Sequence, residues 1–141
     1  MSEKLSERLG ETIETVRLKL ILKYIHPNNE PDYHIHLKSR FRKNGKRIGL
    51  IGTYAGLHDN NNIMVGYNID TRRKMGYATE ALGAITAKLL SEGVIPNLEI
   101  LTDNIASIKT AEKAGYQQVG AGRKDDTFIF APNFEDHTKE M

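Results

Sequence analysis

The stretch that decides the fold is "RRKMGYATEA", Arg72–Ala81, in which three basic residues precede a single glycine and the start of a helical pattern. Apolar residues recur at helical spacing from Ala78 onward, so we expect a helix that begins just after Gly76 and ends near Gly93. Free first-turn amides, the helix dipole and the basic side chains all attract an anion, and glycine lets it approach the backbone closely. The stretch predicts a pyrophosphate site, with an ordinary strand-to-helix turn as the alternative.

Four mainly antiparallel strands are predicted before this helix. They are Thr15–Ile25, Tyr33–Arg42, Arg47–Tyr54 and Ile63–Ile69. In the first of them, Val16, Leu18 and Leu20 are expected on one face. Residues 2–10 are compatible with a short helix.

The pattern after the helix predicts a fifth strand at residues 98–102 and a second helix. That helix is expected to have Asn104 as its cap and Gly115 as its stop. Two closing strands follow, Tyr116–Val119 and Thr127–Phe130. A helix between the fourth and fifth strands implies a parallel crossover, so the fold class is α+β.

The length and composition of the sequence limit the class of protein. With 141 residues the chain is expected to form one domain, residues 1–141. No apolar run reaches the roughly eighteen residues of a membrane span, and the N-terminus is charged where a signal peptide turns apolar, so we expect a cytoplasmic protein without membrane contact. The absence of cysteine excludes disulfides, thiolate metal sites and an acyl-cysteine intermediate.

The run "KSRFRKNGKR", Lys38–Arg47, is a dense basic segment. Its charges alternate with apolar residues about Asn44-Gly45, a strong hairpin signal, so they are expected on the solvent face of two paired strands. A site for an acidic ligand or partner is the other interpretation. The net charge of only +2 argues against nucleic-acid binding over the whole surface.

Two segments carry a resemblance to a known family. "RKMGYA", Arg73–Ala78, matches the R/Q-x-x-G-x-G/A motif of the GNAT superfamily of acetyl-CoA-dependent N-acetyltransferases. "GYNIDTRRKMGYATEAL", residues 66–82, looks like the branch with the ribosomal-protein N-terminal acetyltransferases. "NIASIKTAEKAGY", Asn104–Tyr116, resembles the N-x-x-S-x-x-x-x-E-K-x-G-[FY] segment of that branch.

The resemblance is good over residues 63–119, between N-terminal strands at 15–62 and a closing strand and tail at 120–141. It implies the GNAT fold, a mixed central sheet of six to seven strands with flanking helices. The first two helices of that fold are expected to be reduced or absent, because only "YIHPNNEPDY" separates the first two strands. The acceptor side is therefore expected to be open, or closed by the N-terminal segment or by a second copy of the chain.

The resemblance also implies the co-substrate, acetyl-CoA. In the family the fourth and fifth strands splay apart and the pantetheine arm lies in the gap. The pantetheine would pair with Tyr67, Asn68 and Ile69, and Asn104 would contact it through its side chain. The pyrophosphate would be held by Arg73, Lys74, Met75, Gly76, Tyr77 and Ala78.

Acetyl transfer needs an unprotonated amine, an oxyanion donor and a proton for the departing thiolate. The resemblance makes Glu99, on the fifth strand, the candidate base, with an ordinary solvent-facing carboxylate as the alternative. Many relatives have a tyrosine acid at the position of Ala111, but the ribosomal-protein branch uses a serine at the position of Ser107. Ser107 is the candidate acid, and a capping hydroxyl is the alternative.

His34 and His36 share one face of a predicted strand, yet no third ligand stands at a suitable spacing, so no metal is expected. We expect an N-acetyltransferase acting on a primary amine: a protein N-terminus, a lysine or a small molecule. A homodimer is expected to cover the apolar surface left by the missing wall. The alternatives are a non-catalytic acetyl-CoA-binding module and a nucleic-acid or acidic-protein binder that uses Lys38–Arg47.

Overall fold

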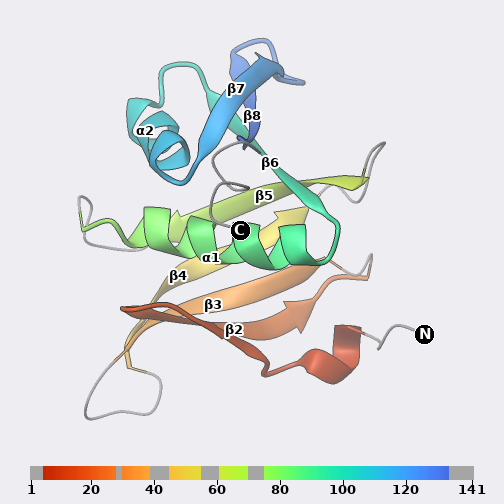
Figure 1. Ribbon diagram of the computed structural model, residues 1–141, viewed down its shortest axis with the longest axis vertical. Coiled ribbons are helices and arrows are strands. Elements are labelled where there is room, and N and C mark those ends of the chain that lie inside the picture. Colours follow the sequence, from red (N-terminus) through yellow and green to blue (C-terminus); the bar gives the residue numbers. More distant parts are fainter. Residues whose placement is uncertain (1–4, 28–29, 39–44, 55–60, 70–74, 134–141) are drawn as a thin grey trace.

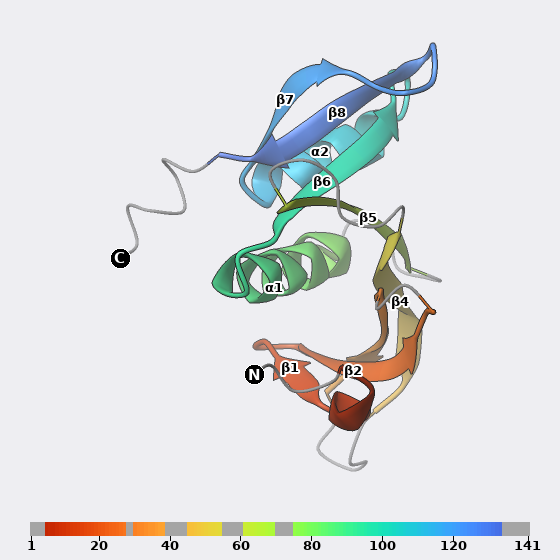
Figure 2. The same ribbon diagram turned by 90° about the vertical axis from the view of Figure 1, so that its right-hand side faces the viewer.

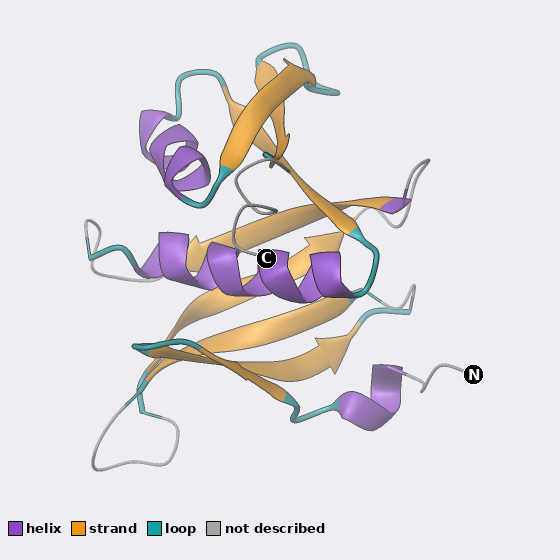
Figure 3. Cartoon of the chain, in the orientation of Figure 1, coloured by secondary structure: helices purple, strands orange, loops and turns teal. Residues whose placement is uncertain are grey.

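The computed structural model describes residues 5–27, 30–38, 45–54, 61–69 and 75–133. Within these ranges the chain forms one mixed sheet with two α-helices against it (Figures 1 and 3). In chain order the elements are the 3-10 helix η1 (Leu5–Arg8), β1 (Thr12–Glu14), β2 (Leu18–Ile25), β3 (Pro31–Leu37), β4 (Arg47–Tyr54), β5 (Asn62–Ile69), α1 (Tyr77–Ser91), β6 (Ile95–Leu101), α2 (Ile105–Lys113), β7 (Tyr116–Ala121) and β8 (Thr127–Pro132). Neither α-helix in these ranges is long and apolar enough to cross a membrane.

The strands follow the order β1-β2-β3-β4-β5-β6-β8-β7 across the sheet. All neighbours are antiparallel except β5 and β6, which run parallel and are joined through α1. A parallel pair needs a crossover of this kind, because its strands must enter the sheet from the same end. The predicted α+β arrangement is confirmed, with eight strands in the described residues instead of six or seven.

The first predicted strand, Thr15–Ile25, is wrong at its beginning. The chain forms β1 and β2 instead, and residues 15–17 turn between them, with the Thr15 N–H donating to the Leu18 carbonyl at 2.9 Å. Val16 is 90% exposed, whereas Leu18 and Leu20, which the prediction placed on the same face, are buried. The alternation rule failed because a turn interrupts the period of two.

Both helices lie where the glycine and asparagine signals predicted them. Helix α1 is bounded by Gly76 and, two residues after its end, by Gly93, whose φ angles are +79° and +78°. Glycine adopts this left-handed backbone without the steric cost that a Cβ brings. Helix α2 begins after its cap Asn104 and ends two residues before Gly115.

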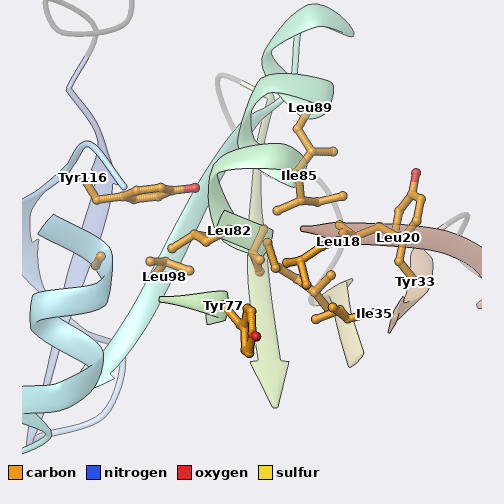
Figure 4. Packing of buried hydrophobic residues seen from close by; sticks show 14 of the residues in the cluster. Leu18, Leu20, Tyr33, Ile35, Tyr77, Leu82, Ile85, Leu89, Leu98 and Tyr116 are labelled. Carbon is orange, nitrogen blue, oxygen red and sulfur yellow. The ribbon is translucent and has the colours of Figure 1, made fainter. Parts of the chain in front are cut away.

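The core lies between α1 and the sheet (Figure 4). Its buried side chains include Leu82, Ile85 and Leu89 from α1, and Leu18, Leu20, Leu22, Tyr33 and Ile35 from strands β2 and β3. Burying an aliphatic side chain of this size contributes about 1.5–3 kcal/mol. This packing fixes α1, and with it the turn at Gly76, against the sheet.

The face of β3 opposite α1 carries Asp32, His34 and His36, which alternate with the buried Tyr33 and Ile35. The rings of the two histidines are 6.2 Å apart. Among the described residues, no group of three or more potential metal ligands comes together.

The connections on either side of β3 bear on two predictions. Residues 26–30 join β2 to β3, which is too few for two helices and agrees with the predicted loss of the first two helices. Strands β3 and β4 pair antiparallel, as the basic hairpin predicts. Residues 39–44 of that basic segment lie outside the described residues.

Candidate functional site

Strands β5 and β6 pair at one end only. Their parallel register covers three residue pairs, from Asn62 with Ile95 to Met64 with Asn97. From Leu98 onward β6 pairs with β8, while β5 stays with β4 as far as Ile69. The two strands therefore diverge, as Figure 2 shows, and the predicted splay is confirmed.

The residues of β5 predicted to pair with pantetheine lie in this divergent part. Tyr67, Asn68 and Ile69 are paired on their other side with Ile51, Leu50 and Gly49 of β4. A strand directs alternate backbone N–H and C=O groups to its two sides. Strand β5 therefore offers hydrogen-bonding groups toward the gap, as an extended ligand with amide groups requires.

The turn at Gly76 lies between the end of β5 and the first turn of α1. Gly76 is the N-cap residue, and among the described residues no side chain caps this end of the helix. The first-turn amides thus lack the acceptor that a capping side chain usually provides. Met75 is exposed beside the turn, Tyr77 is buried and Ala78 is half-buried. Arg72, Arg73 and Lys74 lie outside the described residues, so their predicted phosphate contacts stay predictions.

Arg17, in the turn between β1 and β2, contacts the turn at Gly76 and the first turn of α1. Its Nη1 donates to the Met75 carbonyl and its Nε to Oε1 of Glu80, each at 2.7 Å. The guanidinium carbon lies 4.5 Å from the centroid of the Tyr77 ring. A Cβ placed on Gly76 would lie 3.2 Å from Nη2. Sequence reasoning missed Arg17, because a basic residue in a predicted strand gives no sign of a distant partner.

Glu80 completes this arrangement from the first turn of α1. The Thr15 hydroxyl and, at 2.8 Å, the Arg17 amide both donate to its Oε2. Burial alone would raise the pKa of Glu80, but the hydrogen bonds from Thr15 and Arg17 and the charge of Arg17 outweigh it and lower the pKa. The carboxylate is therefore ionised at neutral pH and paired with Arg17.

Tyr67 of β5 and Ser107 of α2 meet beside the gap. Their hydroxyl oxygens are 3.1 Å apart. Asn104 caps α2 by accepting the Ser107 amide on Oδ1 at 3.2 Å. The capping interaction therefore uses the backbone of Ser107, and its hydroxyl contacts Tyr67 instead. The structure brings together the predicted acid and a predicted pantetheine-binding residue.

Glu99 lies on β6, and its carboxylate is held by the turn between β7 and β8. Oε2 accepts from the Arg123 amide at 2.8 Å and from the Thr127 hydroxyl at 2.9 Å, and Oε1 lies 3.0 Å from Nη2 of Arg123. Burial alone would raise the pKa of Glu99, but hydrogen bonds from Arg123, Thr127 and Lys124 lower it to about 2.

The expected alternative for Glu99, a solvent-facing carboxylate, is wrong, since its side chain is only 6% exposed. A carboxylate with so low a pKa is also a weak proton acceptor at neutral pH. In this geometry Glu99 holds the β7–β8 turn through its hydrogen bonds. Its role as a base stays a prediction.

Solved structures of known proteins share this fold. A domain from Methanocaldococcus jannaschii superimposes with a TM-score of 0.62 at 22% identity, over 74% of this chain and 67% of that one. RimL, a ribosomal L7/L12 alpha-N-protein acetyltransferase solved with coenzyme A, gives 0.61 at 16% identity, over 72% and 60%. AAC(6′)-Ib, solved with ribostamycin and coenzyme A, gives 0.62 at 16% identity, over 78% and 67%. This chain thus spans 60% of the RimL chain and 67% of the other two.

No curated protein matches the sequence. The sequence profile of the acetyltransferase (GNAT) domain matches residues 5–117. This match takes in the divergent strands, the turn at Gly76 and helix α2. The chain therefore belongs to the GNAT acetyltransferase family.

Proposed function

We propose that this chain is an N-acetyltransferase that moves the acetyl group of acetyl-CoA to a primary amine. One observation carries the proposal: β5 and β6 pair only as far as Met64 and Asn97 and then diverge, with the turn at Gly76 following β5. The free side of β5 suits an extended pantetheine arm, and the first turn of α1 suits a pyrophosphate. Two of the structures that share this fold were solved with coenzyme A.

The groups proposed to hold acetyl-CoA are mainly backbone atoms. The pantetheine arm would use the backbone of Tyr67, Asn68 and Ile69 and the side chain of Asn104. The pyrophosphate would use the amides of Met75, Gly76, Tyr77 and Ala78 and the charges of Arg73 and Lys74. Since Oδ1 of Asn104 accepts the Ser107 amide, we assign the contact to pantetheine to its Nδ2.

The reaction proceeds by direct attack of the amine nitrogen on the thioester carbon. The C–S bond then breaks, and the sulfur of CoA leaves with the bonding electron pair and takes up a proton. We assign this proton to the Ser107 hydroxyl, whose oxygen then regains a proton from water. Tyr67, 3.1 Å away, can donate a hydrogen bond to the serine oxygen as its proton leaves.

The amine must lose a proton before or during attack. Glu99 is the base that the resemblance implies, but the pKa of about 2 makes its carboxylate a poor acceptor. We therefore propose that water takes this proton and that Glu99 keeps the β7–β8 turn in place. An amine with a low pKa would then be the better acceptor at neutral pH.

We further propose that the chain stands closest to the ribosomal-protein N-terminal acetyltransferase branch. The segment from Asn104 to Tyr116 supports this, because Asn104 and Ser107 hold the cap and hydroxyl positions of that branch in α2. The proposed function specifies the acceptor as a primary amine and no further. The α-amine of a protein has a lower ordinary pKa than a lysine side chain, which fits transfer without a strong base.

The first experiment titrates acetyl-CoA calorimetrically into the wild type, Gly76→Glu and Gly93→Glu. Both glycines have φ near +79° and bound the same helix, so both substitutions bring similar backbone strain. We expect micromolar binding that disappears in Gly76→Glu, where the carboxylate repels the pyrophosphate, and persists in Gly93→Glu. Absence of binding by the wild type, or equal loss in both variants, would contradict the proposal.

A non-catalytic acetyl-CoA-binding module is the second candidate, favoured by the paired state of Glu99. The two candidates differ in a transfer assay with peptide N-terminal amines, lysine peptides and an aminoglycoside. An enzyme releases free CoA with one of these acceptors and slows on Ser107→Ala. A module binds acetyl-CoA and releases none.

A further inference from the structure

The side chain of Arg17 makes three separate contacts around the turn at Gly76. It donates to the carbonyl of Met75, pairs with Glu80 and lies over the ring of Tyr77. Its own backbone is fixed as well, since its amide donates to Glu80 and its carbonyl accepts the Lys38 amide at 2.9 Å. One side chain thus contacts the residue before Gly76, the residue after it and the acid of the first helical turn.

The contact with Met75 bears directly on anion binding. A carbonyl oxygen carries partial negative charge and repels a phosphate when it points into the same space. Here the Met75 oxygen accepts a hydrogen bond from Nη1 of Arg17 at 2.7 Å. The contact fixes that carbonyl toward Arg17, so among the described residues of the turn the amides that follow Gly76 are the polar groups left to face an anion.

The pairing with Glu80 has a second electrostatic effect. A carboxylate in the first turn favours the helix dipole but opposes an anion bound at the same helix end. Glu80 is ionised and only 17% exposed, and Arg17 supplies the compensating charge at 2.7 Å. Without Arg17, Glu80 would lose the cation that pairs with it among the described residues, and its negative charge would oppose a pyrophosphate.

We propose that Arg17 is a positioning residue of the acetyl-CoA site: it orients the Met75 carbonyl and neutralises Glu80 so that the turn at Gly76 can accept a pyrophosphate. This inference rests on the proposed function. Lysine is not equivalent at this position, because only the planar guanidinium fork donates to the Met75 carbonyl and the Glu80 carboxylate together.

The test compares CoA binding in four full-length proteins: wild type, Arg17→Ala, Arg17→Lys and Arg8→Ala. Arg8 is a matched control, since it donates to Glu11 and to Glu92 beyond the opposite end of α1. Dissociation constants are measured by calorimetry at a temperature where each variant is folded, and melting temperatures are recorded separately. A merely structural role would lower the melting temperature and leave the dissociation constant of the folded protein unchanged.

We expect Arg17→Ala to raise the dissociation constant for CoA about tenfold and Arg17→Lys to raise it about threefold, whereas Arg8→Ala stays within about twofold of the wild type. Equal affinity of Arg17→Ala and the wild type, or an equal loss in Arg8→Ala, would overturn the inference and leave the proposed function intact. If Arg17→Ala does not fold, wild-type affinity in Arg17→Lys overturns it. A wild type that does not bind CoA refutes the proposed function itself.

Discussion

Replacing Tyr116 with phenylalanine removes one hydroxyl group from the contact between α1 and β7. The hydroxyl oxygens of Tyr116 and Thr86 are 2.6 Å apart, and the residues are 4% and 0% exposed. Figure 4 shows the Tyr116 hydroxyl pointing toward α1. Burial raises the pKa of Tyr116 well above its ordinary value, so the phenol stays neutral over the working pH range.

The magnitudes follow from what each substitution leaves behind. Tyr116→Phe leaves the Thr86 hydroxyl buried without its partner, and an unsatisfied buried hydroxyl costs about 1–3 kcal/mol. Thr86→Val has nearly the same shape and leaves the Tyr116 hydroxyl unsatisfied, at a similar cost of about 1–3 kcal/mol. The double variant loses only the net value of one hydrogen bond, about 1 kcal/mol. Its destabilisation should therefore be about 1–5 kcal/mol smaller than the sum of the two single effects.

Urea unfolding of the four proteins measures this coupling, provided that their m-values agree. Additivity of the single effects within about 0.5 kcal/mol would refute the reasoning, because it would mean that the two hydroxyls do not depend on each other. CoA affinity serves as a control. It should stay within about twofold of the wild type in all three variants, since the hydrogen bond is formed between Thr86 and β7 and not at the turn.

Three further predictions concern other parts of the chain. Gly83→Ala should raise the free energy of unfolding, measured with urea, by about 0.5–1 kcal/mol, because a Cβ there meets no atom within 4 Å and alanine favours a helix interior. Gly93→Ala, at φ +78°, should lower this free energy by about 1 kcal/mol. Equal effects of the two substitutions would contradict the assigned backbone angles. Glu99 has a folded pKa of about 2 against 4.5 for the free side chain, so its stabilising contribution is complete above pH 4.5 and is lost as the pH falls toward 2. The free energy of unfolding of Glu99→Gln should therefore fall less over this pH window than that of the wild type. An equal fall in the two proteins would count against the pairing of Glu99. Once an acceptor is known, Ser107→Ala should lower kcat about 100-fold and leave the dissociation constant for acetyl-CoA unchanged. This effect is near the low end for a general acid, because a thiolate leaves readily. An unaltered kcat would remove Ser107 from the mechanism.

Local backbone rules predicted the boundaries of both helices. Gly76 and Gly93 adopt left-handed angles on either side of α1, and Asn104 caps α2 through its side chain. Each of these signals concerns a few neighbouring residues, whose conformational preferences are the same in the sequence and in the fold. The rule of alternation failed at Val16 because the β1–β2 turn depends on residues that are distant in the sequence. Thr15 and Arg17 beside Val16 both donate to Glu80 of α1.

The chemistry of the candidate site was less predictable. Ser107 and Glu99 were both selected by resemblance, yet their surroundings differ: the Ser107 hydroxyl contacts Tyr67 beside the gap, whereas the Glu99 carboxylate is enclosed by the β7–β8 turn. No spacing in the sequence distinguishes a carboxylate that is paired from one that is available. The strand register decides which side chain lies opposite it.

The sequence by itself therefore determined the fold class, the two helices and the glycine turn before α1, because hydrophobic period, caps and left-handed glycines act over a few residues. The tertiary structure alone decided that Arg17 lies on the turn at Gly76, that Glu99 is paired with Arg123 and that Tyr67 touches Ser107. These pairs are separated by 58, 24 and 40 positions, counting Arg17 to the Met75 carbonyl that it holds. Contacts over such separations depend on the order and register of the strands, which a single sequence does not encode in any local pattern.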